Sequence, residues 1–233
     1  MRRLARILSV ALITAGLVVG ADAGLTVLWK EPVSAFTNTL RQNAADSELD
    51  SVSEDFLKQP ETQTVSTRDP ARAAERLADL FEKSVSSGQP IGRIRIPSIG
   101  ADYVVIQGTD EGDLERGPGH YPETAFPGQG KTVAIAGHRT TYGAPFNKID
   151  DIDVGDTVEL DMPYAKFTYE VTDNDIVDPS DVHIVDDTGE ERLVLTACHP
   201  LYSAAQRYAV FAKLGDIELK AGSGAQSDAA RAS

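Results

Sequence analysis

The feature that most constrains the fold is a series of short β-like runs between residues 91 and 220. Valine, isoleucine, threonine and aromatic residues are frequent in these runs, and glycine, proline or aspartate separates one run from the next. Many short strands divided by turn signals are typical of a β-barrel or a β-sandwich. We therefore predict an all-β domain over residues 90–220. Its expected strands, the last of them an eighth candidate, are 92–96, 101–107, 132–136, 157–160, 166–172, 192–196, 208–214 and 216–220.

The N-terminal residues have the composition of a membrane signal-anchor. Arginines within residues 1–6 precede an apolar run, 7–29, that only Asp22 interrupts. About 20 apolar residues suffice for a helix to cross a bilayer, and basic residues before it favour a cytoplasmic N-terminus. We predict a cytoplasmic tail, a single transmembrane helix at 7–29, and a remainder outside the cell. Residues 21–23 also resemble a signal-peptide cleavage site, so removal of the segment is an alternative.

Residues 30–89 are predicted to connect the anchor to the β-domain. Up to residue 68 they are polar with little apolar periodicity, which is typical of a stalk or linker with room for a short helix. A helix at about 69–87 follows, because an Asp-Pro pair at 69–70 suits a helix start and apolar residues recur at helical spacing. This helix is expected to flank the domain, with a lid over a cleft as the alternative. Residues 221–233 are expected to be a disordered tail.

The charge and the cysteine content limit the possible functions. A formal net charge of −14 argues against nucleic acid as a partner, because phosphate binding favours a basic surface. An acidic surface is compatible with an amine-bearing partner, but more often it only keeps a domain soluble. The chain contains one cysteine, Cys198, so no internal disulfide can form.

Cys198 lies at the end of a predicted strand, after the apolar and β-branched run 193–196. Arg207 follows nine positions later and opens a second apolar run, so the thiol and the guanidinium could share one face of a hairpin. His138 follows a third strand-like run, 132–136, and a glycine. A thiol, an imidazole and a guanidinium at strand ends suggest a nucleophile, a proton shuttle and an anion stabiliser. The alternative for a lone cysteine is a small buried hydrophobic residue.

The motifs around these three residues resemble those of the sortases, the membrane-anchored cysteine transpeptidases of Gram-positive bacteria. Gly-His-Tyr-Pro at 119–122 and the Cys-His-Pro sequence make the chain most similar to the class E sortases of actinobacteria. Where the family often has threonine, this chain has Val194 and Ala197, which leaves the nucleophile unchanged. The motifs that carry the resemblance are Gly137-His138-Arg139, Leu195-Thr196-Ala197-Cys198-His199-Pro200 and Arg207.

The resemblance implies a closed eight-stranded sortase-type β-barrel with short flanking helices, and a reaction without a cofactor. It also implies cleavage of a C-terminal sorting signal, of the Leu-Ala-x-Thr-Gly or Leu-Pro-x-Thr-Gly type, between threonine and glycine. Cys198 would form a thioester with the threonine carbonyl, His138 would transfer protons, and Arg207 would stabilise the oxyanion. Arg139 and Arg192 are competing candidates for the oxyanion role.

Substrate contacts are expected from two loops and from the cysteine strand. By resemblance, Tyr121 is associated with Leu-Ala-x-Thr-Gly signals, because its phenol can hydrogen-bond the substrate backbone where an alanine leaves room. His120 is expected in the wall of the cleft, and the connection 172–191 is expected to form the pocket for the leucine of the signal. The candidate substrate-binding residues are Tyr121, His120, Thr196, Ala197, Ile184 and Val182.

No metal site is predicted. The four histidines and the cysteine offer no close ligand pair such as His-x-x-x-His, which argues against zinc. The acidic clusters at 150–153 and 186–191 could hold calcium, as some sortases do. Neither follows a calcium-loop pattern, and solvated turns explain both.

The expected partners are secreted proteins that carry a C-terminal sorting signal, an amine of the cell-wall precursor, and the membrane. Two alternatives remain open. In a pilin-polymerising sortase, a lysine of a second protein would resolve the thioester. In a non-catalytic, surface-displayed β-domain, Cys198 would be a core residue and the function would be binding.

Overall fold

The computed structural model describes residues 12–16, 32–65 and 69–220. The chain forms two units, residues 1–40 and residues 41–233. No helix within the described ranges is both long enough and apolar enough to cross a membrane. The predicted cytoplasmic tail, most of the predicted transmembrane segment and the predicted C-terminal tail lie outside the described residues.

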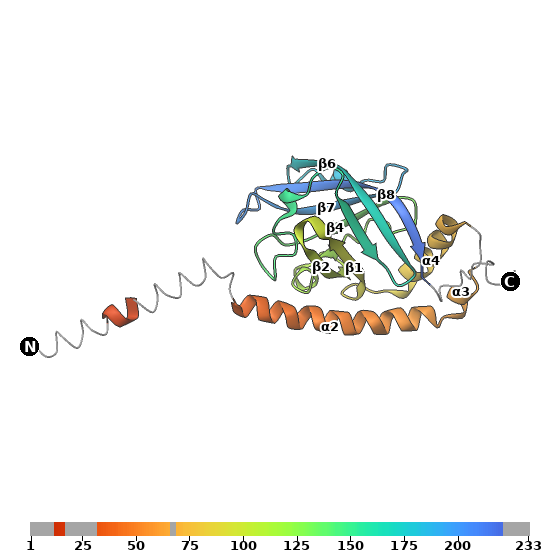
Figure 1. Cartoon of the computed structure of the whole chain (residues 1–233), viewed down its shortest axis with the longest axis horizontal. Coiled ribbons are helices and arrows are strands. Elements are labelled where there is room, and N and C mark those ends of the chain that lie inside the picture. The colour runs from red at the N-terminus through yellow and green to blue at the C-terminus, as the bar shows by residue number, and fades with distance from the viewer. Residues whose placement is uncertain (1–11, 17–31, 66–68, 221–233) are drawn as a thin grey trace, which may run out of the picture. The chain divides into compact units, whose positions relative to one another are not determined.

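Eight strands of the second unit close into a β-barrel, which confirms the predicted eight-stranded barrel (Figure 1). Their order around the barrel is β1-β2-β3-β4-β7-β8-β6-β5. The pairs β2–β3 and β4–β7 are parallel and the other pairs are antiparallel. The strands are β1 Pro90–Ile96, β2 Ala101–Gln107, β3 Gly119–His120, β4 Thr132–Ala136, β5 Thr157–Asp161, β6 Ala165–Val177, β7 Arg192–His199 and β8 Gln206–Leu219.

The barrel core follows the alternation of side chains along its strands. In β6, Phe167, Tyr169 and Val171 are fully buried, whereas the residues between them reach the surface. Strands β4 and β7 differ, because nearly all their residues are buried. Burial on both faces is typical of parallel neighbours and explains why these two strands are continuous apolar runs in the sequence.

Three strand predictions need correction. The run 216–220 is not the eighth strand: residues up to Leu219 continue β8. The register between β6 and β8 shifts opposite Thr168 and Tyr169, so Gly215 lies at a bulge and does not end the strand. The missing strand is β3, two residues of the Gly-His-Tyr-Pro motif. Strand β6 also extends to Val177, into what the sequence suggested was a loop.

Helix α4, Pro70–Ser84, lies within the range predicted for a flanking helix. Asp69 caps it by accepting a hydrogen bond from the Ala71 N–H at 3.0 Å. Phe81 is fully buried and packs edge-on against Phe126, with ring centroids 5.9 Å apart. Residues 69–72 are exposed at the start of this helix and therefore do not form a plug in a cleft.

The range expected to be a linker is largely helical. Helix α2 covers Pro32–Leu57, a length of 26 residues, and α3 covers Pro60–Gln63. Near its end Phe56, 1% exposed, meets the Phe81 ring edge-on at 5.0 Å in the main core. Earlier in the helix, Ala45 is buried together with apolar residues of β2. Residues 41–57 are thus part of the barrel domain and run beside β1 and β2 (Figure 1).

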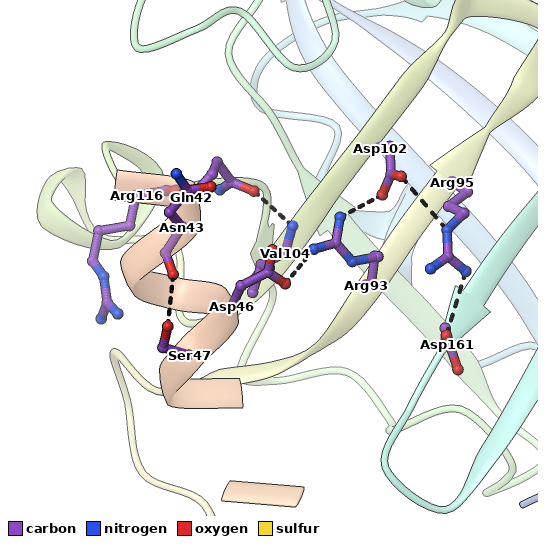
Figure 2. Close-up of polar contacts among 10 residues, drawn as sticks. All are labelled: Gln42, Asn43, Asp46, Ser47, Arg93, Arg95, Asp102, Val104, Arg116 and Asp161. Carbon is purple, nitrogen blue, oxygen red and sulfur yellow. Dashed lines mark hydrogen bonds and ion pairs between the residues drawn. The ribbon is translucent and has the colours of Figure 1, made fainter. Parts of the chain in front are cut away.

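Polar contacts attach residues 42–46 of α2 to the barrel (Figure 2). Because β3 is so short, β2 has no strand neighbour at Val104 on that side. The Val104 N–H instead donates to the Gln42 side chain at 2.8 Å, and Gln42 donates to the Arg116 carbonyl at 2.6 Å. Asp46 pairs with Arg93 of β1. A side-chain amide therefore completes the hydrogen bonding of an open strand edge.

Phe56→Ala is expected to lower the free energy of unfolding by about 3–5 kcal/mol, because it empties a buried aromatic site. Asp55→Ala, at the exposed neighbouring position, is the matched control and should change it by less than about 0.5 kcal/mol. Guanidinium unfolding of the full-length protein measures both values. Equal, small effects would contradict the conclusion that α2 belongs to the core.

Candidate active site

Cys198 lies between His138 and Arg207 because of how β7 pairs with its two neighbours. On one side β7 is antiparallel to β8, and Cys198 is directly opposite Arg207. On the other side it is parallel to β4, with Thr196 opposite Ala136. His138 and Cys198 each lie two residues beyond that pair. Since neighbouring strands are about 4.8 Å apart, the three residues are at one level at the end of adjacent strands.

The ladder between β4 and β7 continues past the last strand pair. The N–H of Gly137 donates to the Thr196 carbonyl at 2.9 Å, directly before His138. A Cβ at Gly137 would come within 2.4 Å of the Phe146 ring, so the close approach of this ring requires glycine. This packing fixes the backbone from which the imidazole projects.

Cys198 is a free thiol at a half-buried position. Residues 193–197 before it in β7 are buried, with Leu195 at 0% exposure. The thiol therefore sits where the strand leaves the core. A half-buried thiol is within reach of a bound substrate, which a cysteine sealed in the core would not be.

His138 is half-buried, and its Nε2 atom is buried without a hydrogen-bond partner. Burial lowers the pKa of His138, while the carboxylates of Glu115 and Glu111 act in the opposite direction. The Tyr142 ring lies against the imidazole, with centroids 5.1 Å apart. Buried ring nitrogens without a partner are rare, and such a nitrogen is available to exchange a proton with a bound group.

Arg207 is half-buried and held by the loop between β7 and β8. Its Nη1 donates to the carbonyls of Ala204 and Gln206, at 3.0 Å each. A guanidinium has five N–H donors in a fixed fork, so two bonds from one nitrogen leave donors for an anion. The loop thus fixes a positive charge beside the residue opposite it, Cys198.

The two competing arginines have structural partners. Arg139 is 2% exposed, pairs with Asp150 at 2.5 Å, and directs Nη1 to the Cys198 carbonyl at 3.5 Å and to His199 Nδ1 at 3.1 Å. Arg192 bonds the Thr132 hydroxyl at 3.1 Å and carbonyls before β7. Arg139 therefore contacts the backbone carbonyl of Cys198 and the His199 ring. The sequence did not suggest this supporting role.

Tyr121 lies next to the cysteine strand. Its hydroxyl is 3.0 Å from the Thr196 hydroxyl, and its N–H donates to the Ala134 carbonyl at 3.0 Å. Thr196 and Ala197 are each 3% exposed. The structure thus brings three of the candidate substrate-binding residues together beside Cys198.

The other loop candidates lie in the 3-10 helix η3, Val182–Val185. Val182 is 72% exposed. Ile184 is half-buried, and its carbonyl accepts a hydrogen bond from Arg192 at 2.9 Å. The strand register that assembles Cys198, His138 and Arg207 does not include this helix.

His120 belongs to the core, contrary to the expectation that it lines a cleft. It is 1% exposed, and its ring nitrogens lie 2.9 Å from the Gln107 side chain and from the Ala125 carbonyl. Burial lowers its pKa to about 4. Alternation along the chain directs His120 inward and Tyr121 outward. Protein groups occupy both ring nitrogens of His120, which a substrate would otherwise use.

The acidic clusters have specific structural partners. Within the described ranges, no group of three or more histidine, cysteine or acidic residues is placed to hold a metal ion. Asp150 pairs with Arg139. Glu191 accepts bonds from the N–H groups of Gly128 and Gly130 at 2.9 Å and from the Tyr169 hydroxyl at 2.8 Å, and burial raises its pKa. The prediction that this acidic cluster is a solvated turn is therefore wrong for Glu191.

Comparison with known proteins identifies the class of this barrel and its site. Residues 94–215 match the sortase domain model, which covers just over half of the chain. The chain belongs to the sortase family, whose members are cysteine transpeptidases.

Individual relatives come from more than one sortase class. Sortase D of Bacillus subtilis is 36% identical over 131 residues, which are 54% of this chain and 65% of that protein. Sortase SrtE1 of Streptomyces coelicolor is 27% identical over 147 residues, which are 56% of this chain and 42% of that protein. The chain thus spans less than two thirds of the length of these two relatives. The structure of sortase E from Streptomyces avermitilis is 32% identical with a TM-score of 0.54, over 60% of this chain and 99% of that chain.

His120→Gln is expected to weaken the pH dependence of stability. The pKa of His120 falls from 6.5 to about 4 on folding, so the unfolded chain takes up the proton first as pH falls. The stability that a neutral His120 contributes is complete above pH 6.5 and is lost between about 6.5 and 4. The loss is about 3 kcal/mol, which unfolding at several pH values measures.

The matched control is His183→Gln at an exposed position, which should keep the slope of the native protein. An unchanged slope in His120→Gln would show that the buried histidine titrates normally.

Proposed function

We propose that this protein is a membrane-anchored sortase whose catalytic domain lies outside the cell. It would cleave a sorting signal of the Leu-Ala-x-Thr-Gly or Leu-Pro-x-Thr-Gly type between threonine and glycine, and join the new carbonyl to an amine of the cell-wall precursor. The observation that carries the proposal is the strand register, which aligns Cys198 with Arg207 on one side and with His138 on the other.

The first half-reaction forms a thioester. The thiol of Cys198 gives its proton to His138 as its sulfur attacks the threonine carbonyl carbon, and the carbonyl oxygen becomes an oxyanion that N–H donors of Arg207 stabilise. When this intermediate collapses, the bond between threonine and glycine breaks. His138 gives its proton to the departing glycine amine, and the acyl group remains on Cys198.

The second half-reaction resolves the thioester. An amine attacks the same carbonyl carbon, and Arg207 again stabilises the oxyanion. His138 takes a proton from the incoming nitrogen, and Cys198 leaves as the thiolate. An amide bond replaces the one that was cut, so the two half-reactions together need no oxidant, metal or cofactor.

The surroundings of His138 suit both directions of proton transfer. Burial alone would hold the imidazole neutral, and the carboxylates of Glu115 and Glu111 favour its protonated form. Burial is the larger of the two influences, so the pKa of His138 is lowered, which favours uptake of a proton from the incoming amine by the neutral ring. Tyr121, bonded to Thr196 beside the nucleophile, is the proposed contact for the backbone of the signal.

No contact among the described residues favours the pilin-polymerising alternative. Its distinguishing feature would be an Asp-Pro segment inserted in the cleft. Here Asp69 caps helix α4, and residues 69–72 are exposed. A protein lysine would leave a product of different mass from a cell-wall amine, which identifies the acceptor.

Cys198→Ala is expected to abolish cleavage of a fluorogenic Leu-Ala-x-Thr-Gly peptide by the full-length protein in detergent. His138→Gln should lower kcat about 10²–10⁴-fold, because proton transfer is lost. Arg207→Ala should lower kcat about 10²–10³-fold through loss of oxyanion stabilisation. Peptide cleavage rates and circular dichroism of each variant provide the measurement.

Two matched controls remove basic side chains elsewhere. Arg72→Ala removes an arginine and Lys58→Ala removes a lysine, both at exposed positions, and each variant should turn over at the native rate. Turnover by Cys198→Ala would rule out the proposed nucleophile. A native thiol that resists iodoacetamide at neutral pH, together with no cleavage of either signal type, would favour the binding-domain alternative.

A further inference from the structure

Tyr142 lies on the loop that follows His138 and has an unusual backbone. The φ angle is +50° at Tyr142, +79° at Gly143 and +48° at Ala144. Residues other than glycine rarely adopt this left-handed region of backbone conformation. A residue held there is strained by about 1 kcal/mol or more. Such strain persists only where the surroundings impose it. Here it places the Tyr142 ring against the His138 imidazole, with centroids 5.1 Å apart.

Two further groups hold the Tyr142 ring on its other sides. Its hydroxyl is hydrogen-bonded to the Glu115 carboxylate, and the Arg41 guanidinium lies over the ring at 5.6 Å from its centroid. Arg41 also pairs with Glu115 at 3.5 Å. Arg41, Glu115 and Tyr142 thus form a closed set of mutual contacts, which we call the Tyr142 clamp.

The clamp depends on helix α2, because Arg41 is the residue before Gln42. The contacts that dock this part of the helix are those of Figure 2: Gln42 at the edge of β2, and Asp46 with Arg93. Glu48 adds an ion pair with Arg116 at 2.6 Å. These side chains are partly exposed, and ion pairs of this kind contribute about 0–1 kcal/mol each. The docking is therefore weaker than the apolar anchor at Phe56.

We propose that Tyr142 is a positioning residue for His138, and that the docking of α2 through Arg41 and Glu115 keeps Tyr142 in place. The contact restricts the imidazole to one orientation, in which Nε2 is buried, and excludes water from one ring face. Undocking of residues 41–49 would release the ring and with it the imidazole. This inference rests on the proposed role of His138 in catalysis.

The charged and titratable groups around His138 come from four parts of the domain. Tyr142 and Arg139 lie on its own loop, Glu111 and Glu115 lie at helix α5 (Glu111–Leu114), and Cys198 and Arg207 lie on β7 and β8. Arg41 faces the outer side of Tyr142. Loss of the Tyr142 ring would hydrate the imidazole while leaving the two carboxylates in place. Hydration removes the burial that lowers the pKa of His138, and the carboxylates still favour a charged ring. The protonated form of His138 is therefore favoured.

Tyr142→Ala is expected to lower kcat about tenfold with KM within about twofold, because a misplaced proton donor affects the chemical step more than binding. The pKa of His138 should rise, followed by NMR titration of the histidine ring carbons and assigned with His138→Gln. Tyr142→Phe keeps the ring and should retain most of the activity and the native titration. A merely structural tyrosine would not shift the titration of one histidine.

Arg41→Ala is expected to change kcat and the His138 titration in the same direction by a smaller amount. In the Tyr142→Ala background it should have no further effect, since both act through one ring. Lys58→Ala removes a charge from an exposed ion pair just beyond the other end of α2 and is the matched control, with native kcat and titration.

Each outcome bears on one part of the inference. Native kcat and native His138 titration in Tyr142→Ala would overturn the positioning role. Additive effects of Arg41→Ala and Tyr142→Ala would overturn the link to α2. An NMR response without any peptide turnover by the native protein would leave the clamp standing and contradict the proposed function instead.

Discussion

The backbone hydrogen bonds of β7 to β4 on one side and to β8 on the other hold together residues that are far apart in the chain. His138 is 60 positions before Cys198, and Arg207 is nine positions after it. A shift of one residue in either ladder would turn every side chain of that strand to the opposite face. Such a shift would also exchange Leu193 and Leu195 with Val194 and Thr196 across the strand, and because both faces are buried it would disrupt the packing on each. The apolar core therefore protects the register on which the candidate site depends.

The sequence predicted the parts of the fold in which one local signal dominates. Strands β4 and β7 are continuous apolar runs because both of their faces are buried, so their ends, and the residues at those ends, could be located. Strand β3 has two residues and leaves no periodicity to detect. Gly215 suggested a break between strands, but it occupies a bulge that only the partner strand β6 reveals.

The same distinction applies to the site and to helix α2. Cys198 and His138 could be selected because they follow strand signals, and Arg207 because it opens one. The burial of His120 depends on Gln107 and Ala125, distant or non-periodic partners that the sequence does not connect to it. Helix α2 escaped prediction because it docks through Gln42, Asp46 and Glu48, polar residues that resemble those of a solvated linker. Tyr142 and Glu115 come from irregular segments, where no period indicates which side chains meet.

Two kinds of contact, one apolar and one polar, attach the helices to the barrel. Phe56 and Phe81 join α2 and α4 to the core by apolar packing, which is strong and insensitive to salt. Arg41, Glu48 and their partners join the start of α2 to the barrel by charge, which salt weakens. The weaker attachment is the one beside His138. A sortase barrel that uses a helix in this way would couple the state of its N-terminal segment to the proton-transfer step.

The proposed reaction depends most on Cys198 as the residue that carries the acyl group. Intact-protein mass spectrometry after incubation with a Leu-Ala-x-Thr-Gly peptide, without added amine, tests it directly. The expected result is a mass increase equal to the fragment that ends in threonine less one water, located at Cys198, sensitive to hydroxylamine and absent from Cys198→Ala. Signal cleavage without any such adduct, or with an adduct at another residue, would contradict it.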